Sequence, residues 1–173
     1  MASFRAHRAN DHDLEPLRLL CTEATGGRGA LWGAKRERFD PAAWHAARAP
    51  LVAVADGPAI VGFAVALGDN VPFGVPRCAE ALVYVTPAQR RRGVARAAMS
   101  ELLAAARAMG LWKLVSYTFA DDLAGIGLLA RLDFRVVGTL VKHVQVDGGW
   151  RDVSLHERLV LAARKSQPSI PDA

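Results

Sequence analysis

The sequence has few of the features that mark a secreted, metal-binding or membrane-spanning protein. Its 173 residues include only two cysteines, Cys21 and Cys78, which lie far apart and have no C-x-x-C spacing. This predicts two buried thiols and argues against a disulfide framework or a thiolate metal site. No apolar run reaches the ~18 residues that a membrane span needs. The N-terminus has no apolar segment of the signal-peptide kind, so we expect a cytoplasmic protein with no metal and no membrane partner.

What the chain does have is apolar content and positive charge. Hydrophobic residues make up 51% of it and the formal net charge is +5, which predicts a folded domain with anionic partners. Those partners could be nucleic acid or a phosphorylated cofactor. The arginines cluster on one turn with no aromatic residues between them, so we expect no nucleic-acid partner.

The hydrophobic pattern predicts one mixed α/β domain over residues 1–160 and a flexible tail over 161–173. Asp56-Gly57 joins two apolar runs in a hairpin, and the chain turns again at Asp147-Gly148-Gly149. Strands are expected over 4–8, on both arms of the hairpin at 51–67, and over 79–86, 112–119, 134–146 and 150–160. Helices are expected from near residue 11 and over 41–48, 95–109 and 123–132, with loops over 25–33 and 70–77.

The stretch TPAQRRRGVARAAM, residues 86–99, places arginines and a glycine where a strand ends and the longest helix begins. A helix N-terminus exposes unpaired N–H groups that bind phosphate, and glycine lets a ligand approach the backbone. Arginine adds charge-assisted contacts. We interpret the segment as a pyrophosphate cradle, and the alternative is a solvated basic turn. The residues concerned are Arg90, Arg91, Arg92, Gly93, Val94, Ala95 and Arg96.

The same segment resembles motif A of the GNAT superfamily, the acyl-CoA-dependent N-acetyltransferases, whose pattern is Gln/Arg-x-x-Gly-x-Gly/Ala. The resemblance covers about residues 3–160 and implies a GNAT fold, with one mixed, mostly antiparallel sheet flanked by about four helices. It implies acetyl-CoA as cosubstrate. Leu82-Val83-Tyr84-Val85 resembles the splayed strand of that fold, so the backbone of Val83, Tyr84 and Val85 is expected to hold the pantetheine arm and the thioester oxygen.

Two further stretches, GLWKLVSYTF (110–119) and KHVQVDGGWRDVSLHERLV (142–160), resemble the phosphinothricin and arsinothricin N-acetyltransferase branch, as does GALW (29–32). This resemblance implies a small amino-acid-like amine as substrate and a homodimer. It suggests a substrate pocket bounded by Trp32, Tyr117, Lys142 and Trp150. Single aromatic residues are equally common in cores and interfaces, so that alternative stays open.

An amine attacks a thioester only after it loses a proton, so the reaction needs a base. Glu80 matches the branch's glutamate on the fourth strand, and burial in its apolar strand would make it a stronger base. The alternative is a strand-edge glutamate facing water. His143 is a second candidate, as a base or as a ligand for the substrate carboxylate. A structural histidine is its alternative.

The chain departs from the family pattern after the fifth strand. Asp121 and Asp122 replace an asparagine, Gly125 replaces a serine, and the following helix has no tyrosine to protonate the leaving thiolate. Asp122 is expected on the cofactor side and could cap the helix at Leu123. The expected function is acetyl transfer to a small primary amine, with a phosphinothricin-like amino acid as one candidate. The alternatives are another small amine, such as an amino-acid derivative or an aminoglycoside, and a degenerate acyl-CoA sensor.

Overall fold

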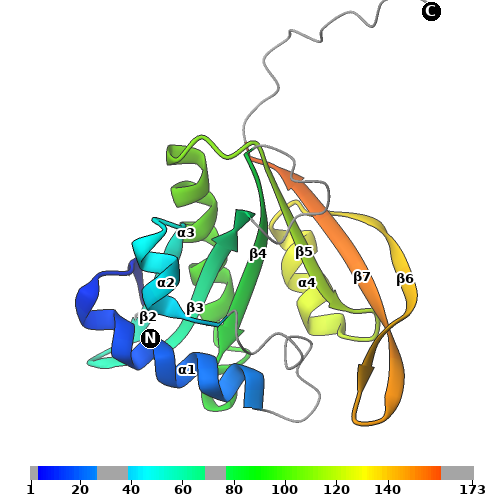
Figure 1. Cartoon of the computed structure of the whole chain (residues 1–173), viewed down its shortest axis with the longest axis horizontal. Coiled ribbons are helices and arrows are strands. Elements are labelled where there is room, and N and C mark those ends of the chain that lie inside the picture. The colour runs from blue at the N-terminus through cyan, green and yellow to red at the C-terminus, as the bar shows by residue number, and fades with distance from the viewer. Residues whose placement is uncertain (1–3, 27–38, 69–76, 161–173) are drawn as a thin grey trace, which may run out of the picture.

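The computed structural model describes residues 4–26, 39–68 and 77–160 and shows one seven-stranded sheet with helices on both faces (Figure 1). The strands are β1 (Arg5–Arg8), β2 (Leu51–Asp56), β3 (Ala59–Leu67), β4 (Cys78–Val85), β5 (Lys113–Phe119), β6 (Arg135–Val146) and β7 (Gly149–Leu159). The helices are α1 (Leu14–Gly26), α2 (Pro41–Ala46), α3 (Val94–Ala108) and α4 (Leu123–Arg131).

The strand order is β1-β2-β3-β4-β5-β7-β6. Only the β4–β5 pair is parallel; the other neighbouring pairs are antiparallel. The predicted fold class, a mixed and mostly antiparallel sheet with about four helices, is confirmed. The element order is also as predicted. The helix expected over 41–48 is shorter and ends at Ala46, while Thr25 and Gly26, expected in a loop, complete α1.

Each face of the sheet carries its own hydrophobic core. On one face α3 and α4 pack on the sheet through buried side chains that include Met99, Leu102, Leu114 and Leu129. On the other face α1 and α2 do the same, with Leu17, Trp44, Phe63 and Leu82. Both cysteines are free and buried, as the composition predicts.

Gly62 in β3 allows the start of α3 to lie close to the sheet. A Cβ atom at this position would come within 2.8 Å of the Tyr84 carbonyl oxygen and 3.0 Å of the Val94 side chain. Any larger residue would push α3 away from β4, so this glycine helps to fix the strand-to-helix turn that carries the arginines. Within the described parts of the chain, no helix has the length and apolar character needed to cross a membrane.

Candidate active site

The parallel strands β4 and β5 separate part of the way along their length. Their ladder runs from Cys78↔Lys113 to Glu80↔Val115 and then stops. Beyond it, residues 81–85 continue to pair with β3, and residues 116–119 continue to pair with β7. In Figure 1 the two strands lie close together at the end where both begin and are well apart at their other ends. The space between 81–85 and 116–119 is called the β4–β5 opening below, and it is the splay that the resemblance predicts.

Backbone groups of β4 alternate between β3 and the opening. The Thr86 N–H donates to the Val61 carbonyl at 3.0 Å, so residue 86 faces β3, and so does Tyr84 two residues earlier. The backbone groups of Val83 and Val85 therefore face the opening. The Val85 carbonyl there accepts a hydrogen bond from Arg90 Nε at 3.3 Å. Three residues are predicted to contact the pantetheine arm, and of these only Val83 and Val85 direct their backbone groups toward the β4–β5 opening.

The side chain of Tyr84 lies on the face of the sheet that α1 and α2 cover. Its ring packs against Phe63, with centroids 5.9 Å apart. Burial raises the pKa of Tyr84 to about 12, and the charge of Glu23 in α1 acts in the same direction. The phenol thus stays protonated at neutral pH and links β4 to α1.

The predicted phosphate cradle has an open backbone at the start of α3. Gly93 is the N-cap residue, with φ of 93°, and no side chain caps the helix there. A Cβ at Gly93 would meet no atom of the described residues beyond its own turn within 4 Å, so the approach is clear. Val94 is buried in the core beneath the turn, which leaves only its backbone available. Uncapped N–H groups beside an open approach fit a pyrophosphate, as a helix N-terminus does generally.

The arginines of this turn fall into two groups. Arg90 is held by the Val85 carbonyl, and Arg92 lies 3.8 Å from the Asp56 carboxylate and 5.2 Å from the Phe4 ring centre. Arg91 and Arg96 are exposed, and no carboxylate in residues 4–26, 39–68 or 77–160 forms an ion pair with either. These two guanidinium groups are therefore the ones available to an external anion.

Glu80 lies at the inner end of the β4–β5 opening. It forms the last ladder pair with Val115, and only 3% of its surface is exposed, so the alternative of a water-facing glutamate is wrong. Its side chain lies on the α1–α2 face of the sheet, as does that of Tyr117. Burial raises the pKa of Tyr117, and the negative charge of Glu80 raises it further, which indicates that the two side chains are close.

The structure does not bring the β6–β7 hairpin residues to Glu80. Along the sheet, Glu80 is level with Val115, Glu157 and Arg135, and β6 is the third strand from β4. That places β6 about 14 Å away at ordinary strand spacing. His143 lies still farther along β6 and is exposed. Within a single chain His143 therefore lies away from Glu80, because the hairpin extends past the end of β5.

The other expected pocket residues are placed as follows. The Lys142 N–H donates to Asp152 Oδ1 at 2.7 Å, which holds an irregularity in β6, and its side chain is exposed. Trp150 is at the tip of the same hairpin and is 60% exposed, so neither residue lines a pocket with Glu80. Tyr117 is the predicted substrate residue that lies beside Glu80, and Trp32 is outside the described residues.

Asp122 caps α4, as the sequence suggests. Its carboxylate accepts from the Gly125 N–H at 3.0 Å and from the Thr118 hydroxyl at 3.2 Å. A Cβ at Gly125 would clash with Asp122 at 2.5 Å, so the glycine that departs from the family pattern allows this cap. Asp121 pairs with Arg151 at 2.5 Å. Both aspartates therefore have partners within the chain, Asp121 an ion pair and Asp122 two hydrogen-bond donors.

Four buried polar side chains form a block that the sequence patterns did not predict. It lies on the α4 face, where Ser116 and Thr118 of β5 pair with His156 and Ser154 of β7. Burial lowers the pKa of His156, which keeps the imidazole neutral at neutral pH. The alternation of serine and threonine in β5 is the only local signal for the block, because its burial depends on pairing with a distant strand.

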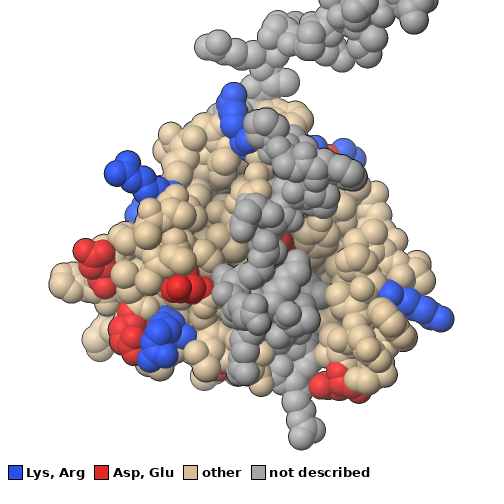
Figure 2. Space-filling model, viewed as in Figure 1, with Lys and Arg blue, Asp and Glu red and all other residues tan. Residues whose placement is uncertain are grey.

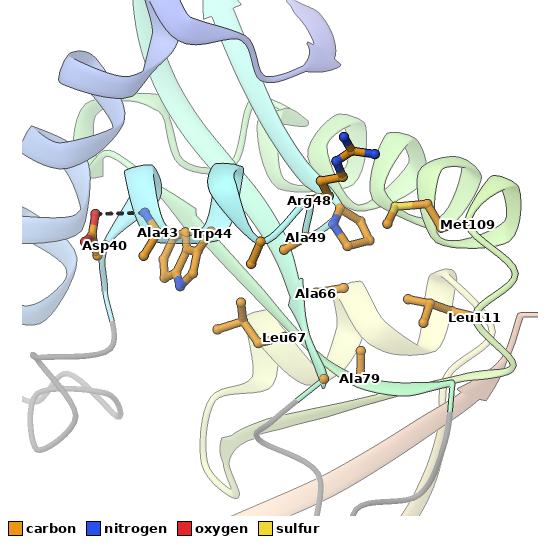
Figure 3. A pocket seen from close by; sticks show the side chains of 13 residues that line it. Asp40, Ala43, Trp44, Arg48, Ala49, Ala66, Leu67, Ala79, Met109 and Leu111 are labelled. Atoms are coloured by element: carbon orange, nitrogen blue, oxygen red, sulfur yellow. Dashed lines mark hydrogen bonds between the residues drawn. The ribbon is translucent and has the colours of Figure 1, made fainter.

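A cavity of about 560 Å³ lies elsewhere, at the end of α3 opposite to Gly93 (Figure 3). Trp44, Leu67, Met109 and Leu111 give it an apolar lining, and the Asp40 carboxylate at its edge caps α2. None of the predicted site residues that the structure describes lines this cavity, so the β4–β5 opening remains the candidate active site.

Comparison with known proteins agrees with this geometry. Residues 15–134 match the acetyltransferase (GNAT) family. A methionine sulfoximine/methionine sulfone acetyltransferase of Pseudomonas paraeruginosa is 31% identical over 163 residues, 90% of this chain and 94% of that protein. A phosphinothricin acetyltransferase of Sinorhizobium meliloti, solved with acetyl-CoA, superposes with a TM-score of 0.81 at 20% identity over 99% of this chain and 95% of that one. An N-acetyltransferase of Staphylococcus aureus superposes with a TM-score of 0.80 at 22% identity, over 92% of this chain and 99% of that one.

A parallel strand pair that opens beside an uncapped, glycine-led helix defines an acyl-CoA-binding transferase fold. The chain belongs to the GNAT acetyltransferase family. It is an N-acetyltransferase that uses acetyl-CoA, and the open backbone at Gly93 fits that cosubstrate, as do Arg91 and Arg96, which form no ion pair with any residue that the structure describes.

Proposed function

We propose that the enzyme acetylates the α-amino group of a small amino acid whose side chain carries a tetrahedral phosphorus or sulfur oxo group. The observation that carries the proposal is the buried carboxylate of Glu80 at the inner end of the β4–β5 opening, on the face that α1 and α2 cover. The similarity to a methionine sulfoximine/methionine sulfone acetyltransferase over 90% of the chain supports the acceptor class. Such an activity would confer resistance to a toxic amino-acid analogue.

In this proposal each part of the opening has one task. Acetyl-CoA supplies the acetyl group. The uncapped first turn of α3, with Arg91 and Arg96, binds its pyrophosphate, and the Val83 and Val85 backbone groups align the arm and donate to the thioester oxygen. Glu80 takes the proton that the ammonium group must lose. The new N–C bond then forms as the C–S bond breaks, and the departing thiolate takes its proton from water.

The experiment is a panel of acceptors with thiol release as the readout, after calorimetry has measured acetyl-CoA binding. Phosphinothricin, methionine sulfoximine and methionine sulfone are compared with methionine, glutamate and an aminoglycoside. We expect kcat/KM for the three tetrahedral analogues to exceed that for methionine and glutamate by at least about tenfold, which is the effect of one well-placed polar contact. A preference for the aminoglycoside, or equal rates throughout, would contradict the proposed acceptor.

We also propose that the enzyme is a homodimer that assembles through the β6–β7 hairpin. In Figure 2 the surface over β6 and β7, on the right of the view, is mostly tan, which means uncharged. Several large apolar side chains of β6 and β7 are exposed, namely Val136, Val137, Val141 and Trp150. Exposed apolar patches of this kind mark association surfaces. Two free, buried cysteines support a further proposal, that the enzyme acts in the reducing cytoplasm.

A further inference from the structure

The inner end of the β4–β5 opening is closed by a side chain. The backbone ladder ends at Glu80↔Val115, and the next residues are Ala81 on β4 and Ser116 on β5. Ser116 Oγ donates to the Ala81 carbonyl oxygen at 3.0 Å. Both residues are buried, Ser116 with 6% of its surface exposed and Ala81 with 1%. At the position where the backbone ladder stops, a side-chain hydroxyl therefore donates the hydrogen bond between the two strands.

This bond ties the strands without drawing them together. A backbone N–H would require ordinary ladder spacing, whereas a hydroxyl on a side chain reaches across a wider separation. The bond is buried, because Ser116, Ala81 and His156, the cross-strand neighbour of Ser116, each have at most 6% of their surface exposed. A buried carbonyl that loses its donor is left unsatisfied at a cost in free energy, so the bond holds the strands at a defined separation.

We propose that Ser116 is a positioning residue that fixes the inner end of the opening and thereby restricts the transferred acyl group to acetyl. The inference rests on the proposed function, in which the thioester lies in this opening. The Ala81 peptide group directly follows Glu80, so the hydroxyl also sets how far the acyl group reaches relative to the base. If the separation point moved by one residue, the opening would deepen by about 3.3 Å, which is room for a longer acyl chain.

The test compares acetyl-CoA with propionyl-CoA in the wild type and in Ser116→Ala. Calorimetry gives both affinities without an acceptor, and steady-state kinetics give KM and kcat for both donors. We expect Ser116→Ala to raise KM for acetyl-CoA and to shift the propionyl-to-acetyl ratio of affinities, and of kcat/KM, by about fivefold toward propionyl. That factor corresponds to the loss of one buried hydrogen bond.

Two variants separate positioning from general stability. Ser154→Ala makes the same change on the same face, in a residue of similar burial on β7, one strand farther from the opening. It should leave the donor ratio unchanged. Ser116→Thr keeps the hydroxyl and should retain the preference for acetyl. If Ser116→Ala does not fold, Ser116→Cys replaces it, since a thiol of similar size donates only weakly and should shift the ratio in the same direction.

The outcomes distinguish this inference from the proposed function. A folded Ser116→Ala protein with wild-type donor ratios in binding and in turnover would overturn the role of Ser116 while leaving the acceptor proposal intact. An equal shift in Ser154→Ala would overturn it as well. A wild type that binds both donors but acetylates none of the amines would contradict the acceptor proposal alone, and the binding ratios would still decide the role of Ser116.

Discussion

Glu80 is the residue on which the proposed chemistry depends most. Its carboxylate is almost completely buried, and it is close enough to raise the pKa of Tyr117. A glutamine would fill the same space but could not accept the proton of the amine. We therefore expect Glu80→Gln to lower kcat by about 100-fold or more, the usual contribution of a positioned base. The affinity for acetyl-CoA, measured by calorimetry, should stay within about twofold, because the cradle lies at the other end of β4.

The matched control for this prediction is Glu15→Gln. Glu15 is an exposed residue of α1 whose carboxylate pairs with Arg18, so the same chemical change occurs far from the opening. Its kcat should equal that of the wild type. If Glu80→Gln also kept the wild-type kcat, Glu80 would have no part in proton removal, and its burial would have to be explained by packing.

At the scale of elements, Glu157 joins three strands. Its carboxylate on β7 accepts from Lys113 Nζ of β5 at 2.7 Å and also pairs with Arg135 of β6. The hydrogen bond from Lys113 is the main cause that lowers the pKa of Glu157 below its ordinary value of 4.5. A carboxylate with a lowered pKa in the folded state stabilises the protein above its unfolded pKa. This stabilisation is lost as pH falls through the folded value.

We therefore expect Glu157→Gln to lower the free energy of unfolding at pH 7 by about 1 kcal/mol, a value reduced for the partial exposure of the partners. The difference from the wild type should shrink as the pH is lowered below 4.5, because the wild-type carboxyl then becomes neutral too. Urea unfolding at a series of pH values from 7 to 3 measures both effects. A difference that stays constant over this range would mean that the Glu157 charge does not stabilise the sheet.

Local sequence patterns predicted the elements themselves. Gly57, Gly110 and Gly148 all have positive φ, and each lies at a turn or helix end that its sequence context indicates. The order of the strands in the sheet could not be predicted from local patterns. The insertion of β7 between β5 and β6 depends on packing between distant segments, and local periodicity carries no information about it. The separation of β4 from β5 was predicted from the resemblance to GNAT enzymes alone.

The same limit explains how much of the candidate site the sequence could place. Glu80 was expected as the base from its match to the glutamate of the resembled branch, and its apolar strand predicted its burial. The separation of His143 and Trp150 from Glu80 could not, because it depends on how far the β6–β7 hairpin extends beyond β5. Ser116 was missed since a serine in an alternating strand is usually exposed, and only pairing with β7 and the contact with Ala81 identify it as buried.

At the scale of the whole molecule, the two edges of the sheet differ sharply. β1 is an edge strand of four residues, whereas β6 is an edge strand of 12 residues with exposed apolar side chains. A long, apolar edge promotes pairing with another chain unless it is blocked. β6 already carries Lys142, and a second charge beside it, within the apolar stretch, should oppose this pairing. Val141 is 70% exposed on β6, so Val141→Lys should not disturb the fold but should convert the proposed dimer into a monomer.

Analytical ultracentrifugation at micromolar concentration measures the outcome against the chain mass of 18.6 kDa. We expect twice that mass for the wild type and for Leu19→Lys, which introduces the same charge at an exposed apolar residue of α1. Val141→Lys should sediment at the chain mass. A monomeric wild type would rule out the dimer itself. A dimer that survives Val141→Lys would mean that the two chains meet on a surface other than the exposed edge of β6.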